Sequence, residues 1–402
     1  MSQSRGRIAR WTPIVVVAAA VSLVLTGCGL TGGLTLRTAA DLTAQSLAKI
    51  TMTPAPTGAN NMVNPGTPLV VAVTAGRLTT VTVTGPDGAV DGVLSSDRST
   101  WTGKGDALEY ASTYHVSAVA VDRLGNPAKF NKTFQTIKPT KFLSLTVNPS
   151  GSSTVGVGIP MKVSLSRGIT DTADRVKLEN HLAVSINGQV TTQGGWRWES
   201  ARVAYYRLPT YWPGNSTIAL TSTIKGLNLG NGIYGRTNTT HTWTTGPSMI
   251  SYVNLVTHEL KVTQNGKLLR TIPITAGKQG FTTRSGIKVI LEKLPSHRMD
   301  AASGGTPKNS PNYYNIVVQY ALRVTWSGEF LHAAPWSEGS QGSANVSHGC
   351  VGMSTANALW YFNHSEIGDV VVYTGSDNLM TMDNGIGDWN VPFPRWVAGY
   401  NT

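Results

Sequence analysis

The sequence is poor in cysteine and in charged residues. Its 402 residues contain two cysteines, and only 13% are Asp, Glu, Lys or Arg, about half of the roughly 25% usual in globular proteins. Two cysteines cannot build a disulfide scaffold or a four-cysteine zinc site. An ordinary apolar share of 40% excludes an intrinsically disordered chain. At roughly 100 to 200 residues per domain, the length predicts two to four domains.

Acidic residues are also scarce, since 21 Asp and Glu stand against 33 Lys and Arg, for a formal net charge of +12. Runs of five or more consecutive basic residues are absent, so the charge does not predict nucleic-acid binding. The polar residues that are present are mainly Thr, Ser, Asn and Gly, which suit short strands and turns better than surface helices. The composition therefore predicts a mainly β fold.

An apolar run over residues 14–25 follows three arginines and precedes small residues, which predicts an export signal over residues 1–27. Twelve helical residues rise about 18 Å, too little to span a hydrocarbon core of roughly 30 Å. The run Leu25-Thr26-Gly27-Cys28 resembles the bacterial lipobox, which implies that a lipid on Cys28 anchors the chain to the outer face of the cell membrane. Removal of the three arginines lowers the formal charge from +12 to +9, which fits an envelope rich in anionic groups.

The next 220 or so residues divide by composition into a tether and two strand-rich blocks. Residues 28–51 are predicted to be the tether, with a modest helical stretch over 39–50. The blocks 52–140 and 141–246 share their punctuation: Gly66-Thr67-Pro68 and Gly158-Ile159-Pro160 each precede a strand pattern near the start, and 132–136 and 241–245 are alternating strands near the end. This repeat predicts two immunoglobulin-like β-sandwiches.

The character of the sequence changes again at about residue 247. Strand patterns cover 250–256, 258–263, 268–275 and 286–291, with a hairpin turn expected at Asn265-Gly266. A Gly- and Pro-rich loop is predicted over 296–311, strands over 314–319 and 323–326, and one helix over 355–364 with an apolar side formed by Ala356, Leu359, Trp360 and Phe362. We therefore expect a third domain over 247–376 and an aromatic subdomain over 377–402 that packs back on a domain.

Cys350 is a candidate nucleophile, because it has no evident disulfide partner and lies in the run Ser347-His348-Gly349-Cys350, with His332 eighteen residues upstream. An adjacent imidazole can take the thiol proton and form an ion pair. In a strand, positions 348 and 350 would face the same side. Gly349 and Gly352 would allow close approach of a substrate backbone, and the amides around Cys350 could hold an oxyanion.

Two other interpretations of these residues stay open. His332, His348 and Cys350 are also ligand types for zinc and would leave a fourth coordination position open, although no carboxylate flanks them. Cys350 could instead be a buried structural residue beside two ordinary histidines.

The pattern of His332, fourteen residues, and then Ser347-His348-Gly349-Cys350 resembles the signature of the L,D-transpeptidase (YkuD) family, which cross-links peptidoglycan. Other short segments resemble lipoprotein members of mycobacterial type: Arg298-Met299-Asp300, Asn309-Ser310-Pro311-Asn312, Ser327-Gly328, Ala334-Pro335-Trp336-Ser337 and Gly387-Asp388-Trp389-Asn390. The resemblance implies two immunoglobulin-like domains followed by a β-rich L,D-transpeptidase catalytic domain, with a short carboxy-terminal subdomain packed against it.

The resemblance also implies a reaction. Cys350 would attack the third residue of a tetrapeptide stem, release D-alanine and form a thioester, and a diamino acid of a second stem would then attack to give a 3→3 cross-link. His332 would be the general base, His348 would position the cysteine loop, and the amides of Gly349 and Cys350 would hold the oxyanion. Carbapenem β-lactams would acylate Cys350, and no metal or other cofactor is implied.

The substrate-binding residues that the resemblance implies are Met299, Tyr314, Trp336, Ser347 and Gly352. Two positions depart from the family pattern. Gly352 stands where family members commonly have Asn or Arg, and Ala333 stands where relatives often have Ser.

The departure at Gly352 keeps an alternative function open. In that alternative, the chain is an envelope-binding protein whose third domain is inactive or is a hydrolytic cysteine carboxypeptidase. A sortase-like peptidase is disfavoured, because the Thr-containing strand expected before its cysteine is not evident.

Overall fold

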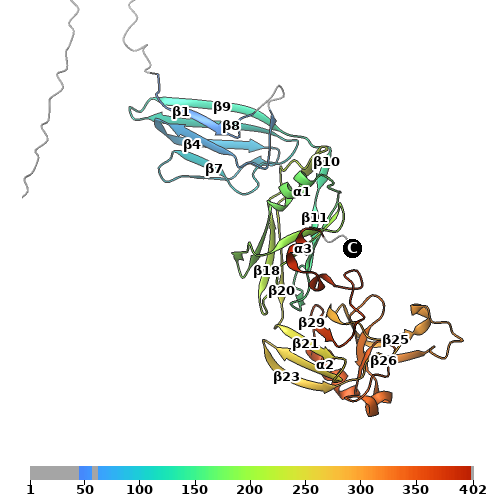
Figure 1. Ribbon diagram of the computed structural model, residues 1–402. Coiled ribbons are helices and arrows are strands. Elements are labelled where there is room, and N and C mark those ends of the chain that lie inside the picture. The colour runs from blue at the N-terminus through green and yellow to red at the C-terminus, as the bar shows by residue number, and fades with distance from the viewer. Residues whose placement is uncertain (1–44, 57–61, 400–402) are drawn as a thin grey trace, which may run out of the picture. The chain divides into compact units, whose positions relative to one another are not determined.

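The computed structural model describes residues 45–56 and 62–399 (Figure 1). The predicted export signal, Cys28 and most of the predicted tether lie outside these residues. The prediction of a mainly β chain is confirmed. Over the part of the chain that the structure describes, no helix combines the length and apolar character needed to cross a membrane.

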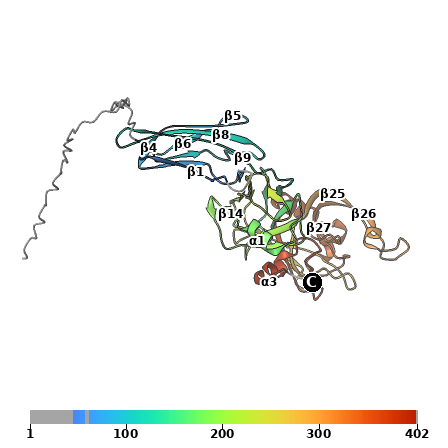
Figure 2. The same ribbon diagram turned by 90° about the horizontal axis from the view of Figure 1, so that it is seen from above.

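The first domain is a sandwich of two sheets, and Figure 2 shows its strands running along the long direction of the domain. One sheet has the order β1 (Lys49–Thr53), β3 (Val70–Thr74), β7 (Thr100–Gly103), β6 (Gly92–Leu94). The other has the order β2 (Met62–Val63), β9 (Pro127–Thr136), β8 (Thr113–Asp122), β4 (Gly76–Gly85), β5 (Gly88–Ala89). Burial alternates along β8, because its period-two apolar residues face the core.

The first sandwich begins earlier than the sequence predicted. Lys49 to Thr53 pair with Thr74 to Val70 as antiparallel strands, so the expected tether boundary at residue 51 falls inside β1. The part of the expected helical stretch that the structure describes, residues 45–50, is not helical, and Lys49 and Ile50 belong to β1. Met52 is buried against the sandwich core and fixes the alternation of this strand.

The second domain repeats the strand order of the first. Its sheets are β11 (Leu145–Asn148), β13 (Met161–Leu165), β17 (Val203–Arg207), β16 (Gly195–Trp198), and β12 (Thr154–Val155), β20 (Thr239–Thr245), β18 (Thr217–Ser222), β14 (Leu182–Ile186), β15 (Gln189–Val190). A two-stranded sheet of β10 (Lys141–Leu143) and β19 (Ile233–Gly235) is added. The helix α1 (Thr172–Glu179), which the sequence analysis missed, begins at an N-cap in which Asp171 accepts a hydrogen bond from Asp174 N–H.

The third domain contains two sheets and one main helix. The first sheet has the order β23 (Lys267–Pro273), β22 (Glu259–Gln264), β21 (Met249–Asn254), β29 (Val370–Thr374), β24 (Gly286–Val289). The second has the order β25 (Glu292–Asp300), β26 (Asn315–Arg323), β27 (Phe330–Ala333), β28 (Val351–Met353), and α2 (Thr355–His364) packs against β26 and β27. The expected turn at Asn265-Gly266 is present, since both residues have positive φ, 50° and 78°, and join β22 to β23.

Three local predictions in this domain are wrong. The loop expected over 296–311 begins with strand, because β25 continues to Asp300 and pairs with β26 in a hairpin that Figure 1 shows in orange. The strand expected over 323–326 ends at Arg323, where a turn reaches Gly328. In α2 the buried residues are Ala358 and Tyr361, while Leu359 is exposed. The buried face of the helix is therefore rotated by about one residue from the predicted face.

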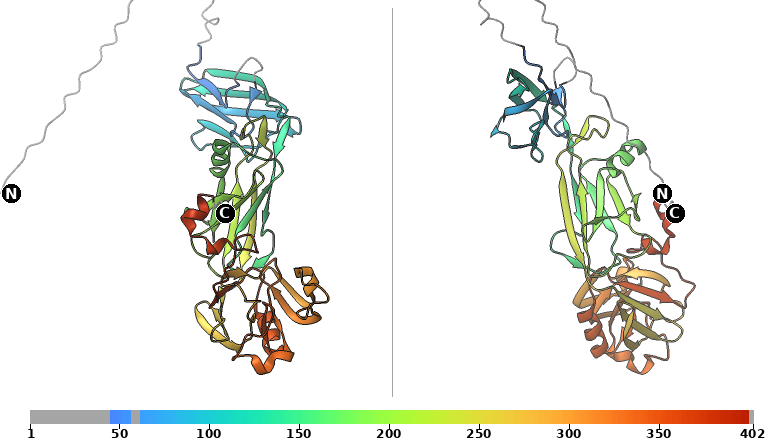
Figure 3. Two further views of the ribbon diagram at one scale, coloured as in Figure 1. Left: turned by 45° about the vertical axis from the view of Figure 1, so that its right-hand side comes forward. Right: turned by 90° about the vertical axis from the view of Figure 1, so that its left-hand side faces the viewer.

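The carboxy-terminal residues pack back as predicted, and they contact two domains. Trp396 and Trp389 are buried, and Asn390 exchanges two hydrogen bonds of 2.7 Å with the backbone of Ile287 in the third domain. The helix α3 (Phe393–Val397) contacts β16 of the second sandwich, and both views of Figure 3 show the red helix beside the green strands of that domain. The resemblance implied packing against the catalytic domain, and the structure adds contacts with β16 of the second sandwich.

Arg207 on β17 connects the carboxy-terminal segment to the second sandwich. Its buried guanidinium donates a hydrogen bond of 2.7 Å to Val391 O. The same group lies 4.8 Å from the ring centroids of Trp389 and Trp396 and 5.4 Å from that of Phe393. Contacts of a cation with ring faces strengthen when water is excluded.

Arg207→Ala is therefore expected to lower the free energy of unfolding by about 2 to 4 kcal/mol, because it leaves a cavity and removes these contacts. Calorimetric melting of both proteins measures the loss. The matched control is Arg236→Ala, since Arg236 is exposed and lies 4.8 Å from the single ring of Phe142. Equal losses in the two variants would contradict a specific role of Arg207.

Candidate active site

Two parallel strands bring His332 and Cys350 to one face of the second sheet. β27 carries His332, and β28 begins directly after Cys350. Their register pairs Leu331 with Val351 and His332 with Gly352. Cys350 directly precedes β28, and His332, Cys350 and Gly352 all line one cavity. Separation by eighteen residues in sequence thus becomes proximity in space.

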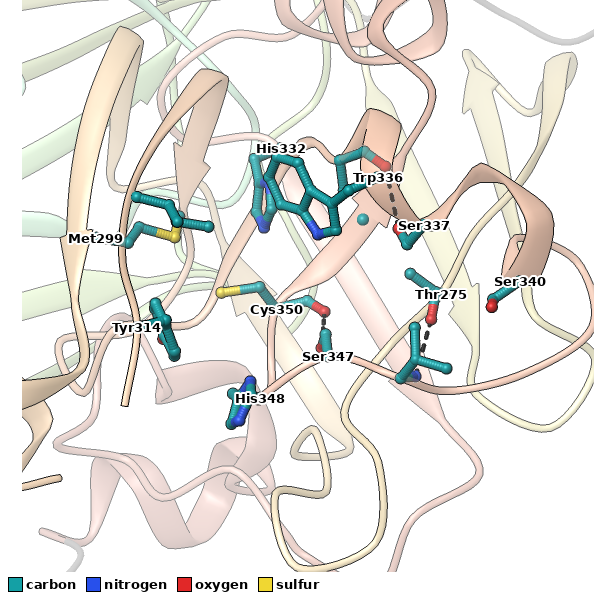
Figure 4. Close-up of a pocket in the computed structure, with 14 residues that line it drawn as sticks. Thr275, Met299, Tyr314, His332, Trp336, Ser337, Ser340, Ser347, His348 and Cys350 are labelled. Carbon is teal, nitrogen blue, oxygen red and sulfur yellow. Dashed lines mark hydrogen bonds between the residues drawn. The ribbon is translucent and has the colours of Figure 1, made fainter. Parts of the chain in front are cut away.

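A cavity of about 400 Å³ opens on this face. Eight of the predicted site residues line it (Figure 4): Met299, Tyr314, His332, Trp336, Ser347, His348, Cys350 and Gly352. Gly349 does not line it. The sulfur of Cys350 points to the part of the cavity where His332, Tyr314 and Met299 lie. The volume is within the usual range of about 300 to 1,000 Å³ for small-ligand sites.

The imidazole of His332 is oriented by the backbone. It is 5% exposed, and Nδ1 lies 2.8 Å from Ala333 O. A carbonyl oxygen can only accept, so Nδ1 carries the hydrogen and Nε2 keeps its lone pair. Burial lowers the pKa of His332 to about 4. The absence of Ser at position 333 therefore does not leave the ring without an orienting partner.

The thiol of Cys350 is 8% exposed and donates a hydrogen bond of 3.6 Å to Gly328 O. Burial raises the pKa of this thiol to about 12, although the backbone N–H of Phe330 lowers it by donating to the sulfur. Because burial disfavours both imidazolium and thiolate, the two groups are neutral at rest. The predicted ion pair is wrong for this state, and the thiol proton would move to His332 only as the sulfur attacks.

The loop before Cys350 is held by its own hydrogen bonds. Ser347 Oγ donates to Cys350 O at 2.6 Å and accepts from Gly349 N at 3.1 Å, while Thr283 Oγ1 donates to Gly349 O at 2.8 Å. Gly349 has φ +121°, a conformation that side chains with a Cβ rarely adopt. Its amide donates to Ser347 Oγ in this structure, so it could hold an oxyanion only by exchanging that bond.

His348 does not share a strand with Cys350. Residues 348–350 form a bend, so the argument from period-two alternation fails. The ring of His348 packs 4.6 Å from the ring centroid of Phe281 and 5.0 Å from that of Tyr314. Burial and the nearby charge of Lys278 lower the pKa of His348. A neutral ring packed in this way supports the wall of the cavity and the cysteine loop.

The geometry does not favour zinc. Figure 4 shows the rings of His332 and His348 on opposite sides of Cys350. Among residues 45–56 and 62–399, no three His, Cys, Asp or Glu side chains are grouped closely enough to hold a metal ion. Separation of the two imidazoles gives no common position for a cation, which needs ligands converging at about 2.0 to 2.3 Å.

Three apolar or aromatic residues shape the cavity from different elements. Met299 lies near the end of β25 and is buried with Cys350 in one apolar cluster, which Tyr314 flanks. Trp336 follows β27, is 60% exposed, and lies 6.1 Å from the ring of His332. These positions make one buried apolar wall and one aromatic surface at the opening.

Gly352 faces a space that its neighbours already fill. It exchanges two backbone hydrogen bonds of 2.9 Å with Thr275. A Cβ at position 352 would lie 2.9 Å from the Cβ of Ala334 and 3.0 Å from Cγ2 of Thr275. The polar side chain common here in the family thus has no room without movement of both neighbours.

Sequence analysis missed several lining residues: Thr275, Ile316, Ala334, Ser337, Ser340 and Val346. Ala334 and Ser337 belong to a segment that carried the resemblance, so that segment was the available signal. Thr275 comes from a distant strand pattern and holds the loop after Ser343, since its hydroxyl donates to Ala344 O at 2.8 Å and accepts from Val346 N at 3.0 Å.

Two family models match the chain. Residues 60–228 match a bacterial Ig domain, and residues 248–372 match an L,D-transpeptidase catalytic domain.

Curated relatives are similar over most of the chain. L,D-transpeptidase 2 of Mycobacterium tuberculosis (strain CDC 1551 / Oshkosh) is 34% identical over 335 residues, which are 83% of this chain and 80% of that protein. L,D-transpeptidase 5 of Mycobacterium tuberculosis (strain ATCC 25618 / H37Rv) is 31% identical over 360 residues, 87% of this chain and 76% of that protein. A solved structure of the transpeptidase LdtMt1 in complex with imipenem is 32% identical, covers 59% of this chain and 100% of its own, and has a TM-score of 0.49.

Proposed function

Because this chain belongs to the L,D-transpeptidase family, we propose that it forms 3→3 cross-links in peptidoglycan through a thioester on Cys350. The observation that carries the proposal is the pairing of a buried thiol with an imidazole in one cavity, where Ala333 O fixes Nδ1–H and leaves Nε2 as the base. A purely structural cysteine would not require an oriented neutral histidine beside it.

The first half-reaction consumes a tetrapeptide stem. Cys350 Sγ attacks the carbonyl carbon of the third residue, a diamino acid, and its proton passes to His332 Nε2. The tetrahedral oxyanion is held by backbone amides of the cysteine loop, for which Gly349 N–H exchanges its bond to Ser347 Oγ. The C–N bond then breaks, His332 returns the proton to the leaving amine, and D-alanine departs from the thioester.

The second half-reaction uses the side-chain amine of another stem's diamino acid. His332 Nε2 takes a proton from this amine as the nitrogen attacks the thioester carbonyl. The C–S bond breaks, the sulfur regains a proton, and a 3→3 amide link remains. The exposed face of Trp336 stands at the opening of the cavity and provides an apolar surface on which the acceptor stem can rest.

The same nucleophile is proposed to react with carbapenems. Attack of Cys350 on the strained β-lactam carbonyl breaks the C–N bond of the ring and leaves an acyl group on sulfur. Because the released nitrogen is still part of the opened drug, no fragment departs. Met299 and Tyr314 form the side of the cavity next to the sulfur, and there they would contact the bound drug.

Incubation of the full chain with a disaccharide-tetrapeptide tests the proposal. We expect stoichiometric release of D-alanine and a dimer whose link joins two diamino acids, both found by mass spectrometry of the products. Release of D-alanine with only tripeptide monomers would instead identify a hydrolytic carboxypeptidase. Absence of both products, with binding retained, would identify the envelope-binding alternative.

We further propose that lipid on Cys28 holds the enzyme at the outer face of the cell membrane. Several acyl chains on one residue anchor a protein stably, whereas one chain binds marginally. Cys28→Ala is therefore expected to move the protein from the membrane fraction to the aqueous fraction of an actinobacterial host. Cys350→Ala, the matched control, should stay with the membrane. A Cys28→Ala protein that still sediments with membranes would overturn this assignment.

A further inference from the structure

Three charged side chains meet behind the cysteine loop, where Lys288 and Glu329 are buried and Arg284 is partly exposed. Lys288 on β24 is 0% exposed, and its Nζ lies 2.6 Å from Glu329 Oε2. Arg284 donates to Glu329 Oε1 twice, from Nη1 at 3.1 Å and from its backbone N–H at 3.0 Å. We call Lys288, Glu329 and Arg284 the buried ion cluster. Its formal charge is +1, from two cations and one carboxylate.

Stability alone does not explain the buried ion cluster. Desolvation of buried charges costs several kcal/mol per ion, and apolar residues of similar volume often serve as well or better. The cost is visible at Lys288, since burial lowers its pKa to about 8 although Glu329 opposes the shift. Its Nζ lies 3.7 Å from the ring centroid of Tyr373, which supplies one further contact.

Glu329 is placed between the two backbone groups that touch the nucleophile. Gly328 O accepts the hydrogen bond from Cys350 Sγ, and the Phe330 N–H donates to the same sulfur. Glu329 Cγ also lies 4.0 Å from the point where a Cβ on Gly349 would be. Fixing the Glu329 carboxylate with three hydrogen bonds therefore fixes both partners of the sulfur.

The groups that face Cys350 differ in their effect on its charge. The neutral rings are His332 on β27, His348 in the cysteine loop, Tyr314 before β26 and Tyr373 on β29. Glu329 raises the pKa of Cys350, while Lys288 and Arg323 lower it.

Arg323 already has a carboxylate of its own. Its Nε lies 2.6 Å from Glu292 Oε2, and its guanidinium lies 4.4 Å from the ring centroid of Phe330. Among the residues that the structure describes, Lys288 has no carboxylate partner except Glu329, whose effect on the thiol pKa it opposes. Lys288 is therefore the cation of the buried ion cluster that lowers the pKa of Cys350.

We infer that the buried ion cluster positions Cys350 and that Lys288 within it stabilises the thiolate as the proton leaves. Lys288, Glu329 and Arg284 are positioning residues, because they act through the backbone at 328–330 and through charge rather than by touching substrate. This inference deepens the proposed function, and it rests on that function only for the role of Cys350 as nucleophile.

Alkylation of Cys350 by iodoacetamide tests the inference without a transpeptidase substrate. The rate is measured on the full chain from pH 6 to 10, with mass spectrometry of the Cys350 peptide. Lys288→Met leaves Glu329 opposed by Arg284 alone, so we expect alkylation at pH 7 to slow about tenfold, the change that one pH unit in thiol pKa produces. The matched control is Lys261→Met, because Lys261 also pairs with a glutamate in the same sheet but is exposed. It should react like the native chain.

A double variant separates charge from packing. Lys288→Met combined with Glu329→Gln restores the charge of +1, so it should alkylate several times faster than Lys288→Met alone. In the native chain, log rate should rise less steeply above pH 8, where Lys288 loses its charge, and Lys288→Met should lack this bend. A double variant as slow as or slower than the single one would overturn the electrostatic role.

If Lys288→Met fails to fold, Arg284→Gln replaces it, because Arg284 is partly exposed. Its alkylation should slow in the same direction, and Glu329→Gln should reverse the change. Unchanged alkylation in Arg284→Gln would count against the inference. Failure of the proposed function would look different, with these rate changes present but no D-alanine released from the tetrapeptide.

Discussion

Cys350→Ala is expected to lower D-alanine release from a tetrapeptide stem by at least about a thousandfold. Loss of a nucleophile removes the covalent step, and no neighbouring group is placed to take it over. The nearest hydroxyl in the cysteine loop belongs to Ser347, whose Oγ donates to Cys350 O and accepts from Gly349 N. The measurement is a time course of free D-alanine with equal concentrations of native chain and variant.

Two controls make the Cys350→Ala result specific. Its melting temperature should stay close to that of the native chain, because the change deletes one sulfur atom beside an existing cavity. Ser337→Ala alters another lining residue whose hydroxyl only donates to Ala334 O, and it should keep most of the activity. Undiminished D-alanine release by Cys350→Ala would contradict a thioester intermediate on Cys350.

His332→Gln is expected to slow carbapenem acylation of Cys350 by about a hundredfold to ten-thousandfold, the usual contribution of a general base. Glutamine keeps a polar group in the strand but cannot accept the thiol proton. Second-order rate constants for adduct formation measure the effect. The matched control is His364→Gln, because His364 ends α2, its Nδ1 lies 2.7 Å from Trp360 O, and its ring stacks on that of Trp360.

The role of His332 as the base also predicts how the acylation rate of the native chain depends on pH. Burial lowers the pKa of His332 to about 4, so protonation of the base requires a lower pH than for an exposed histidine. The acylation rate should therefore persist through pH 6.5 and fall tenfold per pH unit only below about pH 4. A fall in the acylation rate that begins near pH 6.5 would instead indicate that the imidazole of His332 is exposed to water.

Local sequence patterns predicted the parts of the fold that depend on neighbouring residues. Alternation marked the ends of β9 and β20, and the Asn265-Gly266 pair marked its hairpin, because both signals act over a few residues. The repeated punctuation of the two sandwiches also corresponds to one strand order in both. The spacing of His332 and Cys350 was informative because it carried a family signature.

Other features depend on contacts between distant segments. β25 was mistaken for the start of a loop, since its strand character comes from pairing with β26 rather than from apolar alternation. The neutral state of His332 and Cys350 comes from burial that no local pattern reports. Lys288 and Glu329 are 41 residues apart and meet only when the two sheets pack.

The central claim is that Cys350 carries the acyl group of a tetrapeptide. The most direct measurement is intact-mass spectrometry of the full chain, quenched in acid soon after mixing with disaccharide-tetrapeptide, followed by peptide mapping. The account predicts a mass increase equal to the donor minus D-alanine, located on the peptide that contains Cys350 and absent from Cys350→Ala. A chain that releases D-alanine while its Cys350 peptide stays unmodified under quenching would contradict it.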